Sequence, residues 1–239
     1  LHQGGRKMLK VWIAGANGQI GRALNDVLDP MQIETLNTDL DELDITDTDE
    51  VINFGSINRP DVIINCAAVT DTDFCEKEPE LAYRVNALGA RNLSIVARKC
   101  GAKIVQLSTD DVFDGKSKKP YTEFDDTNPL TVYGRSKRAG ENYVKEFTHK
   151  HFIIRSNWVY GKGGHNFVNR VLETAEKGQA LSVASDQFGS PTSAKDLARM
   201  ILYLIDTNEY GTYHVTCSGV CNRYEFATEI LRLAGKEIE

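Results

Sequence analysis

The chain has 239 residues, of which 41% are hydrophobic and 26% are charged, and its formal net charge is -6. This length suits one large domain or one domain with a small appendage. The composition excludes a disordered chain and lacks the basic excess of a nucleic-acid binder, so we expect no nucleic-acid partner. An acidic protein that binds an anion must hold it locally, through backbone amides, a helix terminus or a few placed cations.

Membrane, secreted and metal-binding classes are also not expected. The longest apolar runs, such as VIINCAAV at 62–69, are shorter than the ~20 residues that a membrane helix needs. The opening residues LHQGGRK contain no signal-peptide stretch, which predicts a cytoplasmic location. The five cysteines have no disulfide or metal spacing, so we expect no metal site. Residues 1–7, which precede Met8, are interpreted as a linker from a larger fused polypeptide.

Strand and helix patterns alternate through the first two thirds of the chain. An apolar run at 10–14 breaks into glycines, and residues 19–29 follow with helical periodicity. Further strands are expected at 33–39, 60–68, 102–109 and 151–160, and further helices at 46–57, 79–100 and 131–149. Thr46 or Thr48 is expected to cap the helix at 46–57. This alternation predicts an α/β fold, a Rossmann-type doubly wound parallel sheet with right-handed crossovers.

After residue 160 the alternation loosens, which indicates a small C-terminal lobe. The patterns there predict a helix at 164–178, a short strand at 180–185, a turn at 186–192, a helix at 193–207, a strand at 211–217 and a closing helix from 222. We expect residues 8–160 to form one domain and residues 161–239 to form mainly the lobe, interleaved with the first.

The segment GANGQIG places Gly15, Gly18 and Gly21 between the first strand and the first helix. Glycine is needed where a turn is tight and where backbone must approach a phosphate, and the helix offers its free amides to a pyrophosphate. The context therefore predicts dinucleotide binding. Asp39, after the second strand, would take the ribose hydroxyls of NADH, whereas Arg22 would meet the 2'-phosphate of NADPH. The cofactor is therefore NADPH or NADH, with the choice open.

Tyr133 and Lys137 lie four residues apart in VYGRSKRAGE, on one face of the expected helix. A phenol has a pKa near ~10, and an ammonium one turn away favours the phenolate. We therefore expect Lys137 to lower the pKa of Tyr133, which would then donate a proton to a substrate carbonyl oxygen. The plain alternative is a solvated surface helix in which the two side chains have no chemical role.

Seven segments, in order, resemble the extended short-chain dehydrogenase/reductase family. They are GANGQIG, DVIINCAAVT, EPELAYRVNALGARNL, LSTDDVFDG, NPLTVYGRSK, RSNWVYG and DQFGSPT, which cover the chain from Met8 to about Gly235. Within that family the chain is most similar to the reductases that complete dTDP-L-rhamnose. The resemblance implies NAD(P)H-dependent reduction of the 4-keto group of dTDP-4-dehydro-L-rhamnose, in the biosynthesis of cell-surface polysaccharide.

The resemblance also implies roles for individual residues. Thr109 would bind the substrate carbonyl, Tyr133 would protonate it, and Lys137 would hold the nicotinamide ribose; Ser108 is less suited, because it points to the other face of its strand. Asn86 matches an asparagine beside the active site. The implied cofactor-binding residues are Gly15, Asn17, Gly18, Gln19, Ile20, Gly21, Asp39, Asp44, Ile45, Cys66, Ala67, Ala68, Tyr133 and Lys137. The implied substrate-binding residues are Thr70, Asp111, Trp158, Asn166 and Gln187. Residues 8–160 would then be the NAD(P)-binding domain and residues 161–239 an incomplete substrate-binding lobe.

Asp111 departs from the family pattern, because many relatives carry a tyrosine there. Either the substrate is recognised differently or Asp111 turns outward. Asp110 and Asp111 also keep open an NDP-sugar epimerase or dehydratase with tightly held NAD. A third alternative is a non-catalytic, nucleotide-binding regulatory subunit, since fold alone does not fix function. The implied partner is a nucleotide sugar, and a homodimer is left open.

Overall fold

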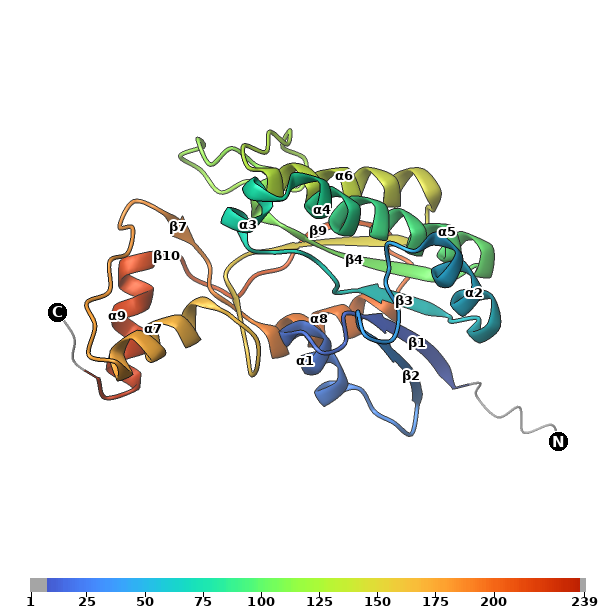
Figure 1. Ribbon diagram of the computed structural model, residues 1–239, viewed down its shortest axis with the longest axis horizontal. Helices are drawn as coiled ribbons and strands as arrows, with labels where there is room; N and C mark the ends of the chain where they lie inside the picture. Colours follow the sequence, from blue (N-terminus) through green and yellow to red (C-terminus); the bar gives the residue numbers. More distant parts are fainter. Residues whose placement is uncertain (1–7, 237–239) are drawn as a thin grey trace.

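The computed structural model describes residues 8–236, so the expected linker at residues 1–7 lies outside the described residues. Six strands form one parallel sheet in the order β2-β1-β3-β4-β5-β9 (Figure 1). The strands are β1 (Leu9–Ala14), β2 (Ile33–Thr38), β3 (Val62–Asn65), β4 (Lys103–Thr109), β5 (His151–Ser156) and β9 (Gly211–His214). The expected Rossmann-type doubly wound fold is confirmed. The strand order reverses between β1 and β3, which is the crevice where such sheets bind ligands.

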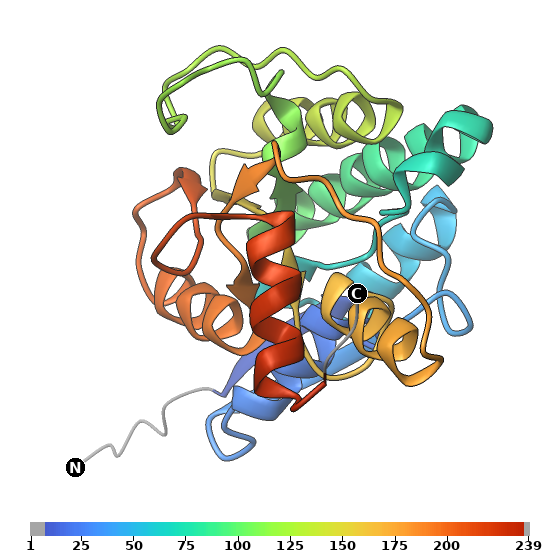
Figure 2. The ribbon, with the colours of Figure 1, turned by 90° about the vertical axis from the view of Figure 1, so that its left-hand side faces the viewer.

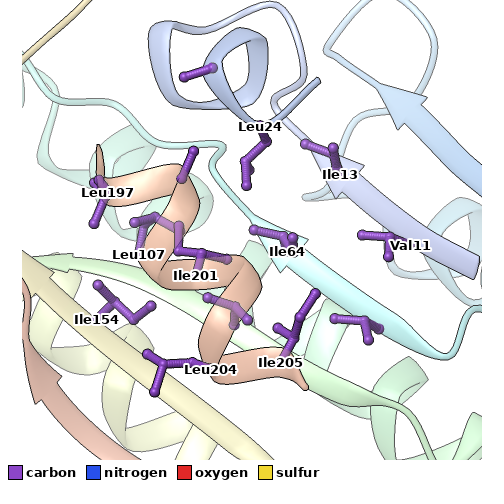
Figure 3. Packing of buried hydrophobic residues seen from close by; sticks show 14 of the residues in the cluster. Val11, Ile13, Leu24, Ile64, Leu107, Ile154, Leu197, Ile201, Leu204 and Ile205 are labelled. Carbon is purple, nitrogen blue, oxygen red and sulfur yellow. The ribbon is translucent and has the colours of Figure 1, made fainter. Parts of the chain in front are cut away.

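Both faces of the sheet are covered by helices (Figure 1). One face holds α1 (Gln19–Val27) and α8 (Ala194–Ile205), and the other holds α2 (Thr48–Asn58), α5 (Ala90–Cys100) and α6 (Val132–Phe147). Side chains alternate along each strand, so Ile13 packs with α1 and α8 (Figure 3) while its neighbour Trp12 packs on the other side. Burial on both faces explains the nearly continuous apolar runs of the central strands.

Helix α2 begins differently from the expectation. Neither Thr46 nor Thr48 caps it; the carboxylate of Asp47 accepts hydrogen bonds from the backbone N–H groups of Asp49 and Glu50. A carboxylate both satisfies free amides and complements the positive end of the helix, whereas a hydroxyl does only the first. The hydroxyl of Thr48 instead donates to the side chain of Asn92 in α5.

The expected helix at 79–100 is interrupted by a π-helical turn. It consists of α4 (Pro79–Tyr83), the π turn η1 (Arg84–Gly89) and α5, and an unexpected short helix, α3 (Thr72–Lys77), precedes it. Asn86 in the π turn is buried, and its side chain bonds to the backbone N–H and C=O of Val69 and to Ser136 Oγ at 2.9 Å each. The π turn therefore ties the loop after β3 to helix α6.

The C-terminal lobe lies beside the carboxyl edge of the sheet (Figure 2). It contains α7 (Phe167–Glu176), α9 (Arg223–Leu233) and the paired strands β7 (Phe188–Gly189) and β10 (Cys221–Asn222). The strand expected at 180–185 is wrong: that segment lays Leu181 and Val183 on the lobe cluster without a neighbouring strand. Helix α8 and strand β9 return to the sheet, so residues after 160 contribute to both parts.

The expected strand at 151–160 is split into β5 and β6 (Val159–Tyr160), and β6 pairs with β8 (Thr192–Ser193). All five cysteines are free. Within residues 8–236, no helix is both long enough and apolar enough to cross a membrane.

Candidate active site

A pocket of about 570 Å³ opens where the carboxyl ends of β3, β4 and β5 meet the lobe. Its walls include eleven of the residues predicted from sequence: Gln19, Ile20, Cys66, Ala68, Thr70, Thr109, Asp111, Tyr133, Lys137, Trp158 and Asn166. Residues more than a hundred positions apart converge here because parallel strands end at a common edge. The prediction that these residues share one site therefore agrees with the geometry.

Helix α6 carries Tyr133 and Lys137 into the pocket. Thr131 caps the helix by accepting a hydrogen bond from Gly134 N at 3.0 Å. A Cβ at Gly134 would lie 2.1 Å from the carbonyl oxygen of Asp111, so only glycine allows the helix to approach the end of β4 so closely. This approach puts the Tyr133 hydroxyl in hydrogen-bonding contact with the side chain of Thr109.

The pKa of Tyr133 is raised in the structure, whereas the sequence predicts that it is lowered. Lys137 was expected to lower it, but burial raises the pKa of this phenol, and the carboxylate of Asp111 raises it further. The hydrogen bond with Thr109 opposes these effects without reversing them. Spacing alone does not reveal burial, which favours the neutral phenol here. Tyr133 is therefore protonated at neutral pH and can donate a proton.

Lys137 is also buried, with 3% of its surface exposed. Burial lowers the pKa of its ammonium to about 8, while the negative charge of Glu141 acts in the opposite direction. Burial likewise raises the pKa of Cys66 to about 12, so this thiol is neutral at physiological pH. Tyr133, Lys137 and Glu141 follow each other at helical spacing, which places all three on the inner face of α6.

Glu141 is the centre of a buried network beneath the pocket. Arg155 of β5 donates to both of its carboxylate oxygens at 2.8 Å, and Ser108 Oγ donates at 2.6 Å. Burial would raise the pKa of Glu141, but the hydrogen bonds and charge of Arg155 hold it below its usual range. Arg138 adds a second cation at 3.1 Å from the Glu141 carboxylate. Ser108, which points away from the expected substrate carbonyl, thus helps to fix α6 against β4 and β5.

The glycine loop after β1 fits a dinucleotide. Gly15 has a φ of 78°, and a Cβ there would lie 2.6 Å from Ala67 N, so the loop passes close under the end of β3. Gly18 precedes α1 as its N-cap and has no side chain to cap the helix, which leaves the first amides of the helix available to a phosphate. At the end of β2, Asp39 accepts a hydrogen bond from Asn17 N at 2.9 Å.

Several predicted binding residues do not line the pocket itself. Asp44 accepts a bond from Thr46 N, and Ile45 is buried under α5. Gln187 is exposed next to β7. The loop residues Gly15, Asn17, Gly18 and Gly21, together with Asp39 and Ala67, form or flank the turn beside it. The binding roles of all these residues stay predictions.

The lobe side of the pocket contains residues that sequence reasoning missed. Trp158 has a φ of 47°, rare for a tryptophan, and the guanidinium of Arg223 lies 3.7 Å from its ring centroid. The missed residues that line the pocket include Asn157, His165, Asn169, Arg170, Glu173 and Arg223. Asn157 sits within the quoted RSNWVYG segment, but nothing in the segment CNRYEF marks Arg223 as a binding residue.

Asp111 lines the pocket rather than turning outward. Burial raises its pKa, and the positive charge of Arg223 across the pocket lowers it. Its neighbour Asp110 reaches the open pocket, yet burial of its carboxylate and the charge of Asp111 raise its pKa to about 6. Hydrogen bonds from Asn157 and Thr109 oppose this rise.

Comparison with known proteins agrees with this geometry. The model of the RmlD substrate binding domain family matches residues 9–239. The chain belongs to the RmlD substrate binding domain family. It is 43% identical to the spore coat polysaccharide biosynthesis protein SpsK of Bacillus subtilis, over 96% of this chain and 81% of the relative.

Solved structures named as dTDP-4-dehydrorhamnose reductases share the fold of this RmlD-family chain. The Clostridium acetobutylicum protein superimposes with a TM-score of 0.94 at 47% identity, covering 97% of this chain and 82% of its own. The Bacillus anthracis protein, solved in complex with NADP, gives 0.94 at 43% identity, with 98% and 84% covered. The family resemblance inferred from the motifs is therefore confirmed.

Proposed function

We propose that the chain catalyses NADPH- or NADH-dependent reduction of the 4-keto group of dTDP-4-dehydro-L-rhamnose to dTDP-L-rhamnose. The observation that supports this most strongly is the convergence of Thr109, Tyr133 and Lys137 on one pocket beside a glycine loop suited to a dinucleotide. The similar proteins carry the name of this reductase, and one was solved with NADP. When bound, the nicotinamide supplies the hydride.

The side chains of this chain would supply the proton and the orientation. Tyr133 is a neutral phenol in contact with Thr109, so a carbonyl oxygen that accepts from both hydroxyls is held still and protonated by Tyr133. The ammonium of Lys137, buried one helical turn away, would hold the nicotinamide ribose and stabilise negative charge left on Tyr133. The phenol must afterwards regain a proton from solvent through the open side of the pocket.

The test is oxidation of NADH and NADPH with dTDP-4-dehydro-L-rhamnose, followed for the wild type and for Tyr133→Phe. We expect kcat of the variant to fall by roughly 10²–10⁴-fold, because the proton donor is lost while the ring is kept. Cofactor binding, measured by fluorescence, should stay unchanged. If the wild type binds cofactor and reduces no 4-keto sugar, the reductase proposal fails.

Two alternatives give different products in the same experiment. A dehydratase or epimerase would use Asp110 or Asp111 near Thr109 and would change the sugar without net consumption of reduced cofactor. A regulatory subunit would bind nucleotide without turnover. The pocket retains the complete donor set of Thr109, Tyr133 and Lys137, which favours a reductase over a silent relative.

The cellular context belongs to the same proposal. The five free cysteines and the substrate class support work in the cytoplasm. The proposed partner is a nucleotide sugar. Dimer formation and fusion to a larger polypeptide remain proposals, which sedimentation of the purified chain and sequencing of its full transcript would test.

A further inference from the structure

The hydroxyl of Thr109 connects Tyr133 to the carboxylate of Asp110. Thr109 Oγ1 donates to Asp110 Oδ1 at 3.2 Å and accepts from the backbone N–H of Asp111 at 3.1 Å. The same side chain is hydrogen-bonded to the Tyr133 hydroxyl. Thr109 is buried, with 6% of its surface exposed, so these partners are not exchanged for bulk solvent. A continuous chain of hydrogen bonds therefore leads from Tyr133 to Asp110.

The single hydrogen of the Thr109 hydroxyl sets the direction of this chain. A threonine hydroxyl donates one hydrogen bond and accepts two. Its hydrogen points to the carboxylate of Asp110 and one lone pair faces Asp111 N, so Tyr133 donates to the other lone pair. When Asp110 takes up a proton, its carboxyl can donate to Thr109, and the Thr109 hydrogen is freed for Tyr133 or for a bound carbonyl oxygen. The protonation of Asp110 thus reverses the chain.

Asp110 is the end of the chain that reaches the open pocket. The residue is exposed, so solvent protons can reach it, whereas neighbouring groups surround its carboxylate. Burial and the charge of Asp111 raise its pKa to about 6, and hydrogen bonds from Asn157 and Thr109 oppose the rise. About a tenth of the molecules therefore carry this proton at pH 7.

The charged groups around Asp110 come from several elements. Asp111 lies in the same turn, and the guanidinium of Arg223 in α9 faces both carboxylates. The pocket wall also carries the ionisable side chains of Cys66, Tyr133, Lys137, His165, Arg170 and Glu173. Of these groups, Tyr133 is the one that the hydrogen bonds of Thr109 join to Asp110.

The reduction would leave Tyr133 in need of a proton. Once the phenol has protonated the substrate oxygen, a phenolate remains, and burial disfavours its charge. The thiol of Cys66, with its pKa raised to about 12, is a weak acid, and deprotonation of Lys137 would remove the cation that stabilises the phenolate. The carboxyl of Asp110 is a much stronger acid than a phenol, so proton transfer from it to the phenolate is favourable.

We propose that Asp110 returns the proton to Tyr133 through the hydroxyl of Thr109. The O–H bond of the Asp110 carboxyl breaks as its proton goes to Thr109 Oγ1, and the hydroxyl hydrogen of Thr109 passes to the phenolate oxygen of Tyr133. The carboxylate left at Asp110 then takes a proton from solvent, so the step moves protons only and all three groups end as they began. This relay rests on the proposed function, because the phenolate forms only when a carbonyl is reduced.

The first experiment follows reduction of dTDP-4-dehydro-L-rhamnose by the wild type and by Asp110→Asn at saturating NADPH. The amide of the variant can still donate to Thr109 but cannot release a proton. We expect kcat at pH 7 to fall by roughly threefold to tenfold, less than on loss of the Tyr133 hydroxyl, because water in the pocket still returns the proton slowly. KM should stay unchanged, and the solvent deuterium isotope effect on kcat should increase. Added acetic acid should restore part of kcat in the variant and change nothing in the wild type.

Asp111→Asn is the matched control, because Asp111 is the adjacent carboxylate and bonds to Thr109 through its backbone N–H alone. The charge of Asp111 raises the pKa of Asp110, so in this variant the ionisation of Asp110 should move to lower pH rather than disappear. Its isotope effect should match the wild type, and acetic acid should not stimulate it. In a Thr109→Val background, Asp110→Asn should have no further effect on kcat, because the relay is already broken.

Carbon-13 NMR of labelled aspartates in the cofactor-free chain tests the link without turnover. One carboxyl should titrate near pH 6 and should be missing from Asp110→Asn. Thr109→Val should raise the midpoint of this titration, because the hydrogen bond from Thr109 favours the ionised carboxylate. Thr109→Ser keeps the hydroxyl and should leave the midpoint near the wild-type value.

Three results would overturn the relay. They are an Asp110→Asn variant with the kcat and isotope effect of the wild type, a kcat of this variant that acetic acid does not restore, and an Asp110 titration that Thr109→Val does not move. If the wild type reduces the sugar and Asp110→Asn matches it, the relay fails and the function stands. If the wild type reduces no 4-keto sugar, the function fails and the relay fails with it.

Discussion

The two walls of the pocket are built in opposite ways. The wall formed by β4, β5 and α6 is fixed by the fully buried Glu141–Arg155 pair, with Ser108 bonded to the same carboxylate. The lobe wall relies on half-buried aromatic rings around Phe226. The groups that would perform the chemistry thus sit on rigid elements, and the groups that would recognise the nucleotide sit on a wall that can adjust. Such a division suits an enzyme that must admit and release a large substrate.

The largest expected effect comes from removing one partner of the buried pair. Arg155→Met leaves the carboxylate of Glu141 buried without its main cation, so we expect a loss of about 3–5 kcal/mol in the free energy of unfolding. Urea denaturation measures it. The double variant Arg155→Met with Glu141→Gln should recover most of the lost stability. The control Arg232→Met, which removes one partner of the exposed Arg232–Glu229 pair, should have no measurable effect. An Arg155→Met variant as stable as the wild type would remove the basis for calling this wall rigid.

Weakening the lobe wall should have a smaller and local effect. Phe226 packs against Trp158, Tyr160 and Phe167, with ring centroids 5.5 to 6.3 Å apart. We expect Phe226→Ala to cost about 1–3 kcal/mol and to raise KM several-fold with little change in kcat. Hydrogen exchange should speed up in α7 and α9 and stay unchanged in β4 and α6. Faster exchange in α6 would mean that the two walls are not independent.

The buried ammonium of Lys137 should cost stability at neutral pH. Its pKa of about 8 lies below the 10.5 of an exposed lysine, so the unfolded chain binds more protons between these values and stability rises with pH there. Lys137→Met should therefore stabilise the cofactor-free chain by about 1–3 kcal/mol at pH 7, with the gain shrinking above pH 8. Thermal melts across this pH range measure it, and a variant that is destabilised at pH 7 would contradict it.

The smallest expected effect is that of replacing Asp110, which lines the pocket between its two walls. Asp110 has its pKa raised to about 6, so the wild type should show an ionisation near this pH in the profile of kcat/KM. In Asp110→Asn that ionisation should disappear, with a change below about tenfold at pH 7. A profile that keeps the same acidic limb in the variant would assign the ionisation to another group.

The sequence predicted the fold and the core of the site for one physical reason. Strand–helix alternation fixes a parallel sheet, and the ends of its strands gather at one edge, so Thr109, Tyr133 and Lys137 had to meet if each was placed on the right element. Their local spacing was enough for that placement.

What the sequence did not predict depends on packing across the chain. The pKa of Tyr133 follows from burial, which spacing does not reveal. Arg170 and Arg223 meet only because α7 and α9 pack together in the lobe, where no motif marks them. The segment at 180–185 has the alternation of a strand but no neighbour to pair with, and Asp47 outcompetes Thr46 and Thr48 as a cap because it is charged.

The π turn at Arg84–Gly89 holds one residue more than an ordinary α-helical turn would. Deleting a single residue there would convert the turn to α-helix and leave α5 facing the sheet as before, so Leu93 and Val96 would stay in the core. The side chain of Asn86 would instead lose its bonds to Val69 and Ser136. A one-residue deletion at this point therefore acts on the loop after β3 and on helix α6, whereas the exposed loop at 115–120 tolerates the same change.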